Sequence, residues 1–213
     1  MRPNIIEQVD TTFIITIGIS FFLLIVITIT MIVFVFRYNK KRNPVPSNIS
    51  GNTLLEIIWT VIPLILVMII FFSGYTGFKN MRDAPENSMV VKVTGQMWKW
   101  TFEYANKKIS DTLFVPVGQP IKLEIYSVDV NHSLYLPAFR VKEDAIPGRV
   151  NYLWFQPMYE GTFDIACAEY CGLSHSLMYS KLVVLPENEF YEWYNKSQPI
   201  DSTINIRNTD TQK

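Results

Sequence analysis

The chain has 213 residues with 19 basic and 19 acidic side chains, which gives a formal charge of zero at neutral pH. This balance gives no support to nucleic-acid binding, which depends on a strong excess of basic side chains. Apolar residues make up 49% of the sequence and are concentrated in two long runs near its start.

Those two runs are long enough to cross a membrane. Residues 11–36 contain no charged side chain, and residues 54–78 contain only Glu56. A helix needs about 20 residues to span the hydrocarbon core of a bilayer. The first run is too long for a signal peptide, and no Ala-x-Ala cleavage site follows it. We therefore expect a hairpin of two transmembrane helices at residues 11–36 and 54–78, after a short outer segment at residues 1–10.

The connection between the runs, residues 37–53, sets the orientation. It carries Arg37, Lys40, Lys41 and Arg42 and no acidic residue, so the positive-inside rule predicts a cytoplasmic loop. Both termini are then expected on the outer face. From residue 80 to the end, 13 basic and 16 acidic side chains give the exported part a net charge of −3.

Beyond the second run, short stretches with alternating apolar and polar residues predict β-strands. These are residues 89–94, 98–104, 121–126, 151–155, 162–166 and 181–185. Strands at this spacing suggest one antiparallel sandwich or barrel. We place this all-β domain at residues 79–195, with a short closing helix that starts near Pro186. The polar tail, residues 196–213, is expected to be unstructured.

The residues that carry chemistry are gathered in one segment, Cys167-Ala-Glu-Tyr-Cys171-Gly-Leu-Ser-His175-Ser-Leu-Met178, which holds both cysteines of the chain and one of its two histidines. The other histidine, His132, follows the strand-like run at residues 121–130. Taken alone, the cysteines could form a disulfide outside the cell. A Cys₂His₂ zinc site is a second alternative, although the two histidines of such sites are normally close in sequence. His132 alone could be an ordinary hydrogen-bonded histidine, and Met178 alone could fill the core.

The combination favours copper. Blue-copper sites use a late loop with Cys, then His, then a weak Met ligand, and a second His from an earlier strand. This loop has that order and one additional cysteine. Two thiolates can bridge two copper ions and leave one imidazole for each. Such a site has no evident open position for a substrate, so we expect electron transfer.

Three segments resemble cytochrome c oxidase subunit II: Val130-Asn-His132-Ser, the stretch from Pro137 to Arg149, and the Cys167–Met178 segment. The resemblance extends over residues 10–195. It implies a cupredoxin-like fold and a binuclear copper A centre with the side chains of His132, Cys167, Cys171, His175 and Met178 as ligands. It also implies that Glu169 provides a backbone carbonyl to copper, with its carboxylate facing a magnesium ion shared with subunit I.

The resemblance assigns further roles. Glu56 matches a glutamate at the mouth of a proton-uptake channel, although Thr53-x-x-Glu56 is also a capping box for the second helix. Trp98 matches the position that accepts electrons from cytochrome c, although alternating aromatic residues are more often sheet packing. In this sequence Lys99 stands between two tryptophans, where an aromatic residue is common. Asp144 and Arg149 match positions at the contact with subunit I near the haem propionates, although Pro147-Gly148 could equally be a surface turn with flanking charges.

The function expected from these features is one-electron transfer. A cytochrome c would reduce the copper pair near Trp98, and the electron would pass to haem in a separate subunit I, where oxygen is reduced and protons are pumped. Haem is expected only in partner subunits, because the chain has no Cys-x-x-Cys-His motif. Subunit III is a further expected partner, and a bacterial inner membrane is preferred over a mitochondrial one. The alternatives are a copper-A subunit of a nitric oxide reductase and a membrane-anchored binding module stabilised by zinc or a disulfide. A quinol-oxidase subunit II would lack the copper ligands.

Overall fold

The structure is a computed structural model that describes residues 5–45 and 51–196. The predictions for the first four residues, for residues 46–50 of the loop and for residues 197–213 of the tail lie outside the described residues. The chain divides into two compact units, Met1–Pro85 and Glu86–Lys213.

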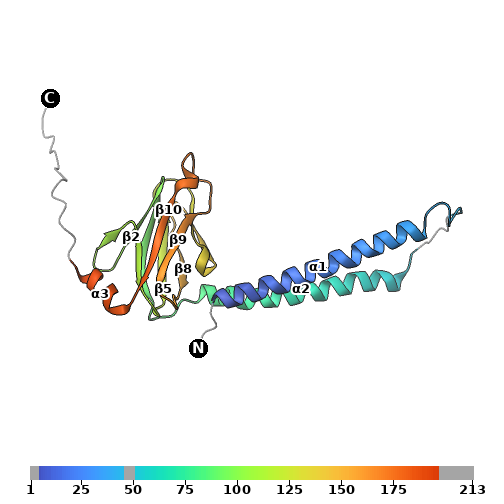
Figure 1. The fold of residues 1–213 in the computed structure, drawn as a ribbon, viewed down its shortest axis with the longest axis horizontal. Coiled ribbons are helices and arrows are strands. Elements are labelled where there is room, and N and C mark those ends of the chain that lie inside the picture. The colour runs from blue at the N-terminus through green and yellow to red at the C-terminus, as the bar shows by residue number, and fades with distance from the viewer. Residues whose placement is uncertain (1–4, 46–50, 197–213) are drawn as a thin grey trace, which may run out of the picture. The chain divides into compact units, whose positions relative to one another are not determined.

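The first unit is a hairpin of two long helices, α1 (Ile5–Arg37) and α2 (Thr53–Arg82), which run side by side (Figure 1). The hydroxyls of Thr12 and Ser73 lie 3.1 Å apart across the pair, and Asn80 donates a hydrogen bond to Gln8 at 3.1 Å. Most of their large apolar side chains are exposed in the isolated chain, as expected of helices that face lipid or other subunits. Each helix extends past its apolar run, because helical hydrogen bonding continues through the polar residues at either end.

The start of α2 differs from the predicted capping box. Asn52, not Thr53, is the N-cap, and its side-chain oxygen accepts a hydrogen bond from the Leu55 N–H at 3.1 Å. Asparagine is among the best N-cap residues because its short side chain reaches the free amides of the first turn. Glu56 lies in that first turn, where a negative charge suits the helix dipole.

The second unit is a sandwich of two five-stranded sheets. The first sheet has the spatial order β3 (Ile109–Ser110), β2 (Lys99–Glu103), β1 (Met89–Gln96), β5 (Ile121–Ser127) and β8 (Asn151–Phe155). The second has the order β4 (Leu113–Pro116), β10 (Tyr179–Leu185), β9 (Gly161–Cys167), β6 (His132–Leu136) and β7 (Val141–Ala145). Along β5 every second side chain is buried, which places Leu123 and Ile125 in the core between the sheets.

The predicted hairpin followed by an all-β cupredoxin-like sandwich is confirmed, but the expectation of purely antiparallel sheets is wrong. β1 pairs in parallel with β5, and β4 pairs in parallel with β10. Parallel neighbours require the chain to cross between sheets rather than turn back directly. The alternation of apolar and polar residues predicts a strand but does not indicate the direction of its neighbour. The closing helix, α3 (Glu187–Asn195), follows Pro186 as expected.

Candidate metal centre

The loop with the two cysteines joins β9 to β10, which pair antiparallel with Ala166 opposite Tyr179. Cys167 is the last residue of β9, and its backbone N–H donates to the Met178 carbonyl at 3.1 Å. The intervening chain folds back over a short 3₁₀ helix, η2 (His175–Leu177), at the upper end of the sandwich as drawn in Figure 1. The hairpin therefore brings the first and last residues of the motif together.

His132 reaches the same place from β6. The sequence suggested that it ends the strand at residues 121–130, but it begins a new strand in the other sheet. β6 pairs with β9 so that Leu134 lies opposite Cys167, two residues beyond His132. This pairing explains why a histidine 35 residues earlier in the chain meets the cysteine loop.

The four side chains form a chain of close contacts. The two Sγ atoms lie 3.8 Å apart. His132 Nδ1 lies 3.9 Å from Cys167 Sγ, and His175 Nδ1 lies 3.5 Å from Cys171 Sγ. Each sulfur thus has its own imidazole neighbour.

Two further groups complete the cluster. The Met178 sulfur is buried and lies 3.8 Å from Cys171 Sγ. The backbone carbonyl of Glu169 lies 3.3 Å from Cys167 Sγ, while the residue itself is exposed. The cluster therefore presents soft sulfur, imidazole and carbonyl donors together, the donor types that copper sites use.

The geometry fits metal binding better than a disulfide. Both cysteines are free, and a disulfide would need sulfurs about 2.05 Å apart. Two thiolates bound to one tetrahedral ion at about 2.3 Å each would lie about 3.8 Å apart, as these do. Among the described residues, the ligand atoms of His132, Cys167 and Cys171 lie within 4.8 Å of one another, a group that does not include His175. His175 joins the cluster through Cys171, because its Nδ1 atom lies 3.5 Å from that sulfur.

Trp98 contacts this loop directly. It lies in the turn between β1 and β2, and its indole N–H donates to the Cys171 carbonyl at 3.2 Å. Gly172 has a φ of 112°, and a Cβ there would lie 3.5 Å from the indole ring. With 37% of its surface exposed, Trp98 touches both the metal loop and the solvent.

Two family profiles match the chain. The profile for the cytochrome c oxidase subunit II transmembrane domain matches residues 3–75, and that for its periplasmic domain matches residues 106–185. The cytochrome c oxidase subunit 2 of Alkalihalophilus pseudofirmus is 37% identical over 172 residues, which cover 75% of this chain and 50% of that protein. The subunit 2 of Cereibacter sphaeroides is 31% identical over 204 residues, which cover 77% of this chain and 67% of that protein.

The chain belongs to the cytochrome c oxidase subunit II family. It is therefore a membrane protein with an external domain, of the kind that serves as subunit II of haem–copper oxidases. It spans between half and two thirds of the length of the first two relatives described above. Among solved structures, the periplasmic domain of subunit II of the Bradyrhizobium japonicum cytochrome oxidase is 33% identical, covers 52% of this chain and 94% of that domain, and has a TM-score of 0.48.

The surroundings shift the pKa values of two groups at the candidate metal centre. Burial, together with the neighbouring Cys167 thiol, raises the pKa of the Cys171 thiol to about 11. Burial acts against the charge of Asp129 as well, but hydrogen bonds from the Met97 N–H and from His132 outweigh it and lower the pKa of that carboxyl to about 2. The site therefore holds a permanent negative charge beside His132 at neutral pH.

The sequence did not indicate that three further residues contact His132. Asp129 contacts the imidazole Nε2 at 2.8 Å, Trp100 packs edge-on at 5.9 Å between ring centroids, and Gly95 leaves room for both rings. The spacing Asp-Val-Asn-His was the only available signal for Asp129. Trp100 belongs to the aromatic run around Trp98, but nothing local marks its contact, or that of Gly95, with His132.

The remaining residues named from the sequence lie on other elements. Glu56 belongs to the helical unit and is exposed at the start of α2. Asp144 lies on β7, where it accepts a hydrogen bond from the Ser133 hydroxyl at 2.7 Å. Arg149 follows a turn in which Gly148 has a φ of 74°, and its N–H donates to the Ile146 carbonyl at 3.3 Å.

Proposed function

We propose that this chain is the electron-accepting subunit of a haem–copper oxidase and holds two copper ions. The side chains of His132, Cys167, Cys171, His175 and Met178, with the carbonyl of Glu169, are the proposed ligands. The observation that carries the proposal is the pair of free thiols 3.8 Å apart, each beside a different imidazole nitrogen. When bound, the copper pair would supply a one-electron redox couple.

The protein's own contribution is a rigid and largely dry set of donors. His132 and Met178 have no exposed surface, and Cys171 is 4% exposed. The hydrogen bond from Cys167 N–H to the Met178 carbonyl closes the loop at its base. A site held by two paired strands changes little in geometry when its charge changes, which favours fast electron transfer.

Trp98 is the proposed path from the donor. Its ring is partly exposed and its N–H is bonded to the Cys171 carbonyl, so it offers a short route from the surface to a ligand residue. The proposed donor is a c-type cytochrome. The proposed acceptor is haem in a separate subunit I, with oxygen as the final acceptor and subunit III as a further partner.

Three finer assignments follow from the family. Glu169 is exposed, so its carboxylate remains available for a magnesium ion shared with subunit I. Glu56, at the start of α2, is proposed to assist proton uptake; Glu56→Gln should then slow proton-coupled turnover while leaving the copper content unchanged. The proposed location is the bacterial inner membrane with the sandwich on the periplasmic side.

Metal analysis and electron spin resonance of the purified full chain test the copper proposal. We expect two coppers per chain and, in the oxidised form, a signal from an electron shared between two copper nuclei. Cys167→Ser and Cys171→Ser should each abolish that signal. Met178→Leu should alter it, whereas Met158→Leu, at an exposed methionine, should not. Zinc in place of copper, a signal from a single nucleus, or a Cys167–Cys171 disulfide in the active protein would refute it.

A further inference from the structure

Asp129 lies in the loop between β5 and β6, and its carboxylate has four donor groups within hydrogen-bond distance. Oδ1 accepts from the Val130 N–H at 2.7 Å, contacts His132 Nε2 at 2.8 Å and lies 3.2 Å from the Ser127 hydroxyl. Oδ2 accepts from the Met97 N–H at 2.7 Å. One side chain therefore bonds its own loop, a proposed metal ligand and the turn that carries Trp98.

The contact with His132 fixes which imidazole nitrogen carries the proton. An ionised carboxylate can only accept hydrogen bonds, so Nε2 must be the donor. In a neutral ring the other nitrogen, Nδ1, then keeps its lone pair free. Nδ1 is the nitrogen that faces Cys167 Sγ at 3.9 Å. The Asp129 contact thus prepares the ligand atom on the side where a metal would bind.

The remaining sides of the ring are closed by packing. His132 has no exposed surface. Trp100 meets it edge-on, and a Cβ built on Gly95 would lie only 3.1 Å from His132 Cδ2. With backbone and indole on these sides, the Asp129 carboxylate holds the remaining Nε2 edge of the ring.

The same carboxylate reaches the turn of Trp98. Met97 N–H is bonded to Asp129, and Trp98, the next residue, donates to the Cys171 carbonyl. A continuous path of hydrogen bonds thus runs from His132 through Asp129 and the turn to the backbone of the cysteine loop. Removal of Asp129 would loosen two parts of the site together.

We propose that Asp129 is a positioning residue that holds His132 with its proton on Nε2 and ties this histidine to the turn that carries Trp98. The inference deepens the proposed copper function and rests on it for its biological meaning. The hydrogen-bond arrangement itself is a property of the metal-free chain. The two can therefore be tested separately.

The first test reads the imidazole directly. The chain has only two histidines, so ¹⁵N-histidine labelling of the metal-free full-length protein in detergent gives one signal set for each. We expect His132 to carry its proton on Nε2 alone in the native protein and to exchange between both nitrogens in Asp129→Ala. Asp129→Asn, which keeps the side-chain shape but offers one acceptor oxygen instead of two, should fall between them. His175 serves as the internal reference.

The second test measures copper affinity of the same variants by titration with a competing chelator. Loss of the carboxylate that orients a ligating histidine should weaken binding by about 10- to 100-fold. Asp164→Asn removes the same charge from an exposed residue paired with Lys181 and should leave affinity unchanged.

The outcomes separate the two proposals. If His132 in the native chain carries its proton on Nδ1, or if Asp129→Ala changes neither its signals nor the copper affinity, the role of Asp129 is refuted. If the native chain binds no copper while the labelling result holds, the copper function fails and the positioning of His132 stands. A misfolded Asp129→Ala protein leaves the isosteric Asn variant to decide.

Discussion

At the scale of single residues, Gly95 has a role that only the packing reveals. It lies on β1, and a Cβ at this position would come within 3.0 Å of Trp100 and 3.1 Å of His132. Neither neighbour can move easily, because both rings are buried against each other. The missing side chain is what allows the His132 ring to lie this close to β1.

Gly95→Ala should therefore destabilise the sandwich by about 1–3 kcal/mol, the usual range for overpacking a dense core. It should also weaken copper binding, because His132 is displaced from Cys167. Denaturant unfolding of the full chain and copper titration measure the two effects. Gly18→Ala adds the same methyl group where a Cβ meets no atom within 4 Å, and it should leave copper affinity unchanged while slightly favouring helix α1. A Gly95→Ala protein with the stability and copper affinity of the native chain would show that the crowding at Gly95 is relieved without consequence.

The sequence predicted only those parts of the candidate site that consist of rare residue types. The two cysteines, His175 and Met178 are uncommon and lie in one short segment, so their order, with His132 earlier in the chain, indicated a copper loop. Asp129 and Gly95 are common residue types whose importance comes from what surrounds them after folding. A pattern within one segment does not contain that information.

At the scale of elements, Tyr104 connects the two sheets. It directly follows β2 in the first sheet, and its hydroxyl donates to the Phe114 carbonyl at 2.9 Å and accepts from the Phe114 N–H at 2.8 Å on β4 of the second. α3 covers this junction, with Trp193 5.1 Å from the Tyr104 ring and 4.4 Å from the Phe114 ring between centroids. Lys108 strengthens the cover by donating to the Trp193 carbonyl at the end of α3.

Tyr104→Phe should lower the free energy of unfolding by about 1–3 kcal/mol, because both backbone groups of Phe114 lose their partner. The loss should be seen by denaturant unfolding without a change in copper content. Burial raises the pKa of the Tyr104 hydroxyl, so the folded state holds this proton more tightly than the unfolded one. The native protein should therefore lose stability as the pH rises above about 10, where an unfolded tyrosine ionises.

The Phe variant lacks this group, so its stability should fall less steeply over the same alkaline range. Parallel slopes in the two proteins would contradict a buried, protonated Tyr104. The tyrosines that both proteins share cancel in the comparison.

Six strands and the closing helix could be predicted at this scale, because their alternation is strong. The strands β3, β4, β6 and β7 were missed for identifiable reasons. β3 has only two residues, and β4 ends at Pro116. β6 is buried at four of its five positions and so shows no alternation, while β7 has the sequence Val-Lys-Glu-Asp-Ala, which is mostly charged. Pairing with a neighbour, rather than intrinsic preference, makes these segments extended.

At the scale of the whole molecule, the helical unit and the sandwich were the most predictable features. Each has a hydrophobic pattern set by its surroundings, which are lipid for the helices and water for the sandwich. Uncharged runs such as residues 11–36 are long enough for a bilayer, and no other common environment requires them. The sandwich instead buries alternate residues between two sheets. The change in period near residue 88 therefore separates the units in the sequence as it does in the structure.

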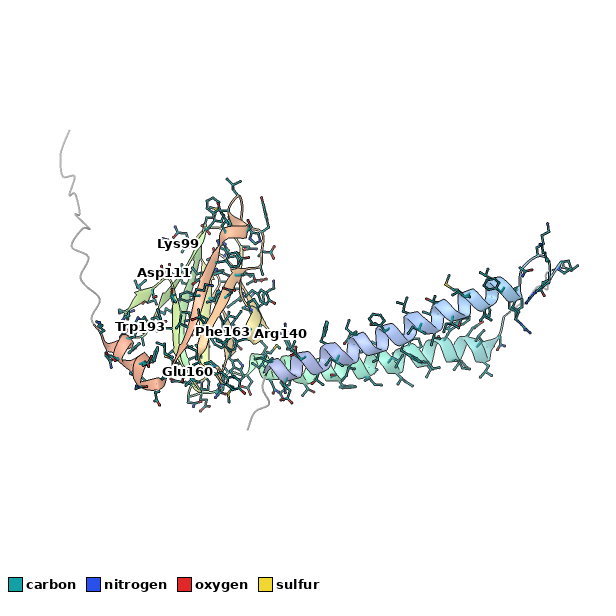
Figure 2. All side chains as sticks on the ribbon, viewed as in Figure 1. Lys99, Asp111, Arg140, Glu160, Phe163 and Trp193 are labelled. Carbon is teal, nitrogen blue, oxygen red and sulfur yellow. The ribbon has the colours of Figure 1, made fainter. Side chains whose placement is uncertain are left out.

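Charge is the property of the whole molecule that should govern the encounter with a donor. The part of the chain after residue 79 has 13 basic and 16 acidic side chains, a net charge of only −3. Lys99, next to Trp98, adds a positive charge at the proposed contact and lies at the end of the sandwich away from Trp193 (Figure 2). Both features weaken attraction for a basic cytochrome.

We therefore expect the reduction of the copper-loaded full chain by a basic c-type cytochrome to slow by less than about tenfold between low and moderate salt, below the range of strongly steered pairs. Stopped-flow reduction over a salt series measures this. Lys99→Glu should make the reaction faster at low salt and steepen its salt dependence, because it replaces a repulsive charge beside Trp98 with an attractive one. Lys196→Glu makes the same charge change at the end of α3 and should have little effect, since a charge at the far end of the sandwich is screened from the contact. A steep salt dependence in the native chain, or equal responses to the two substitutions, would place the donor's contact elsewhere than at Trp98.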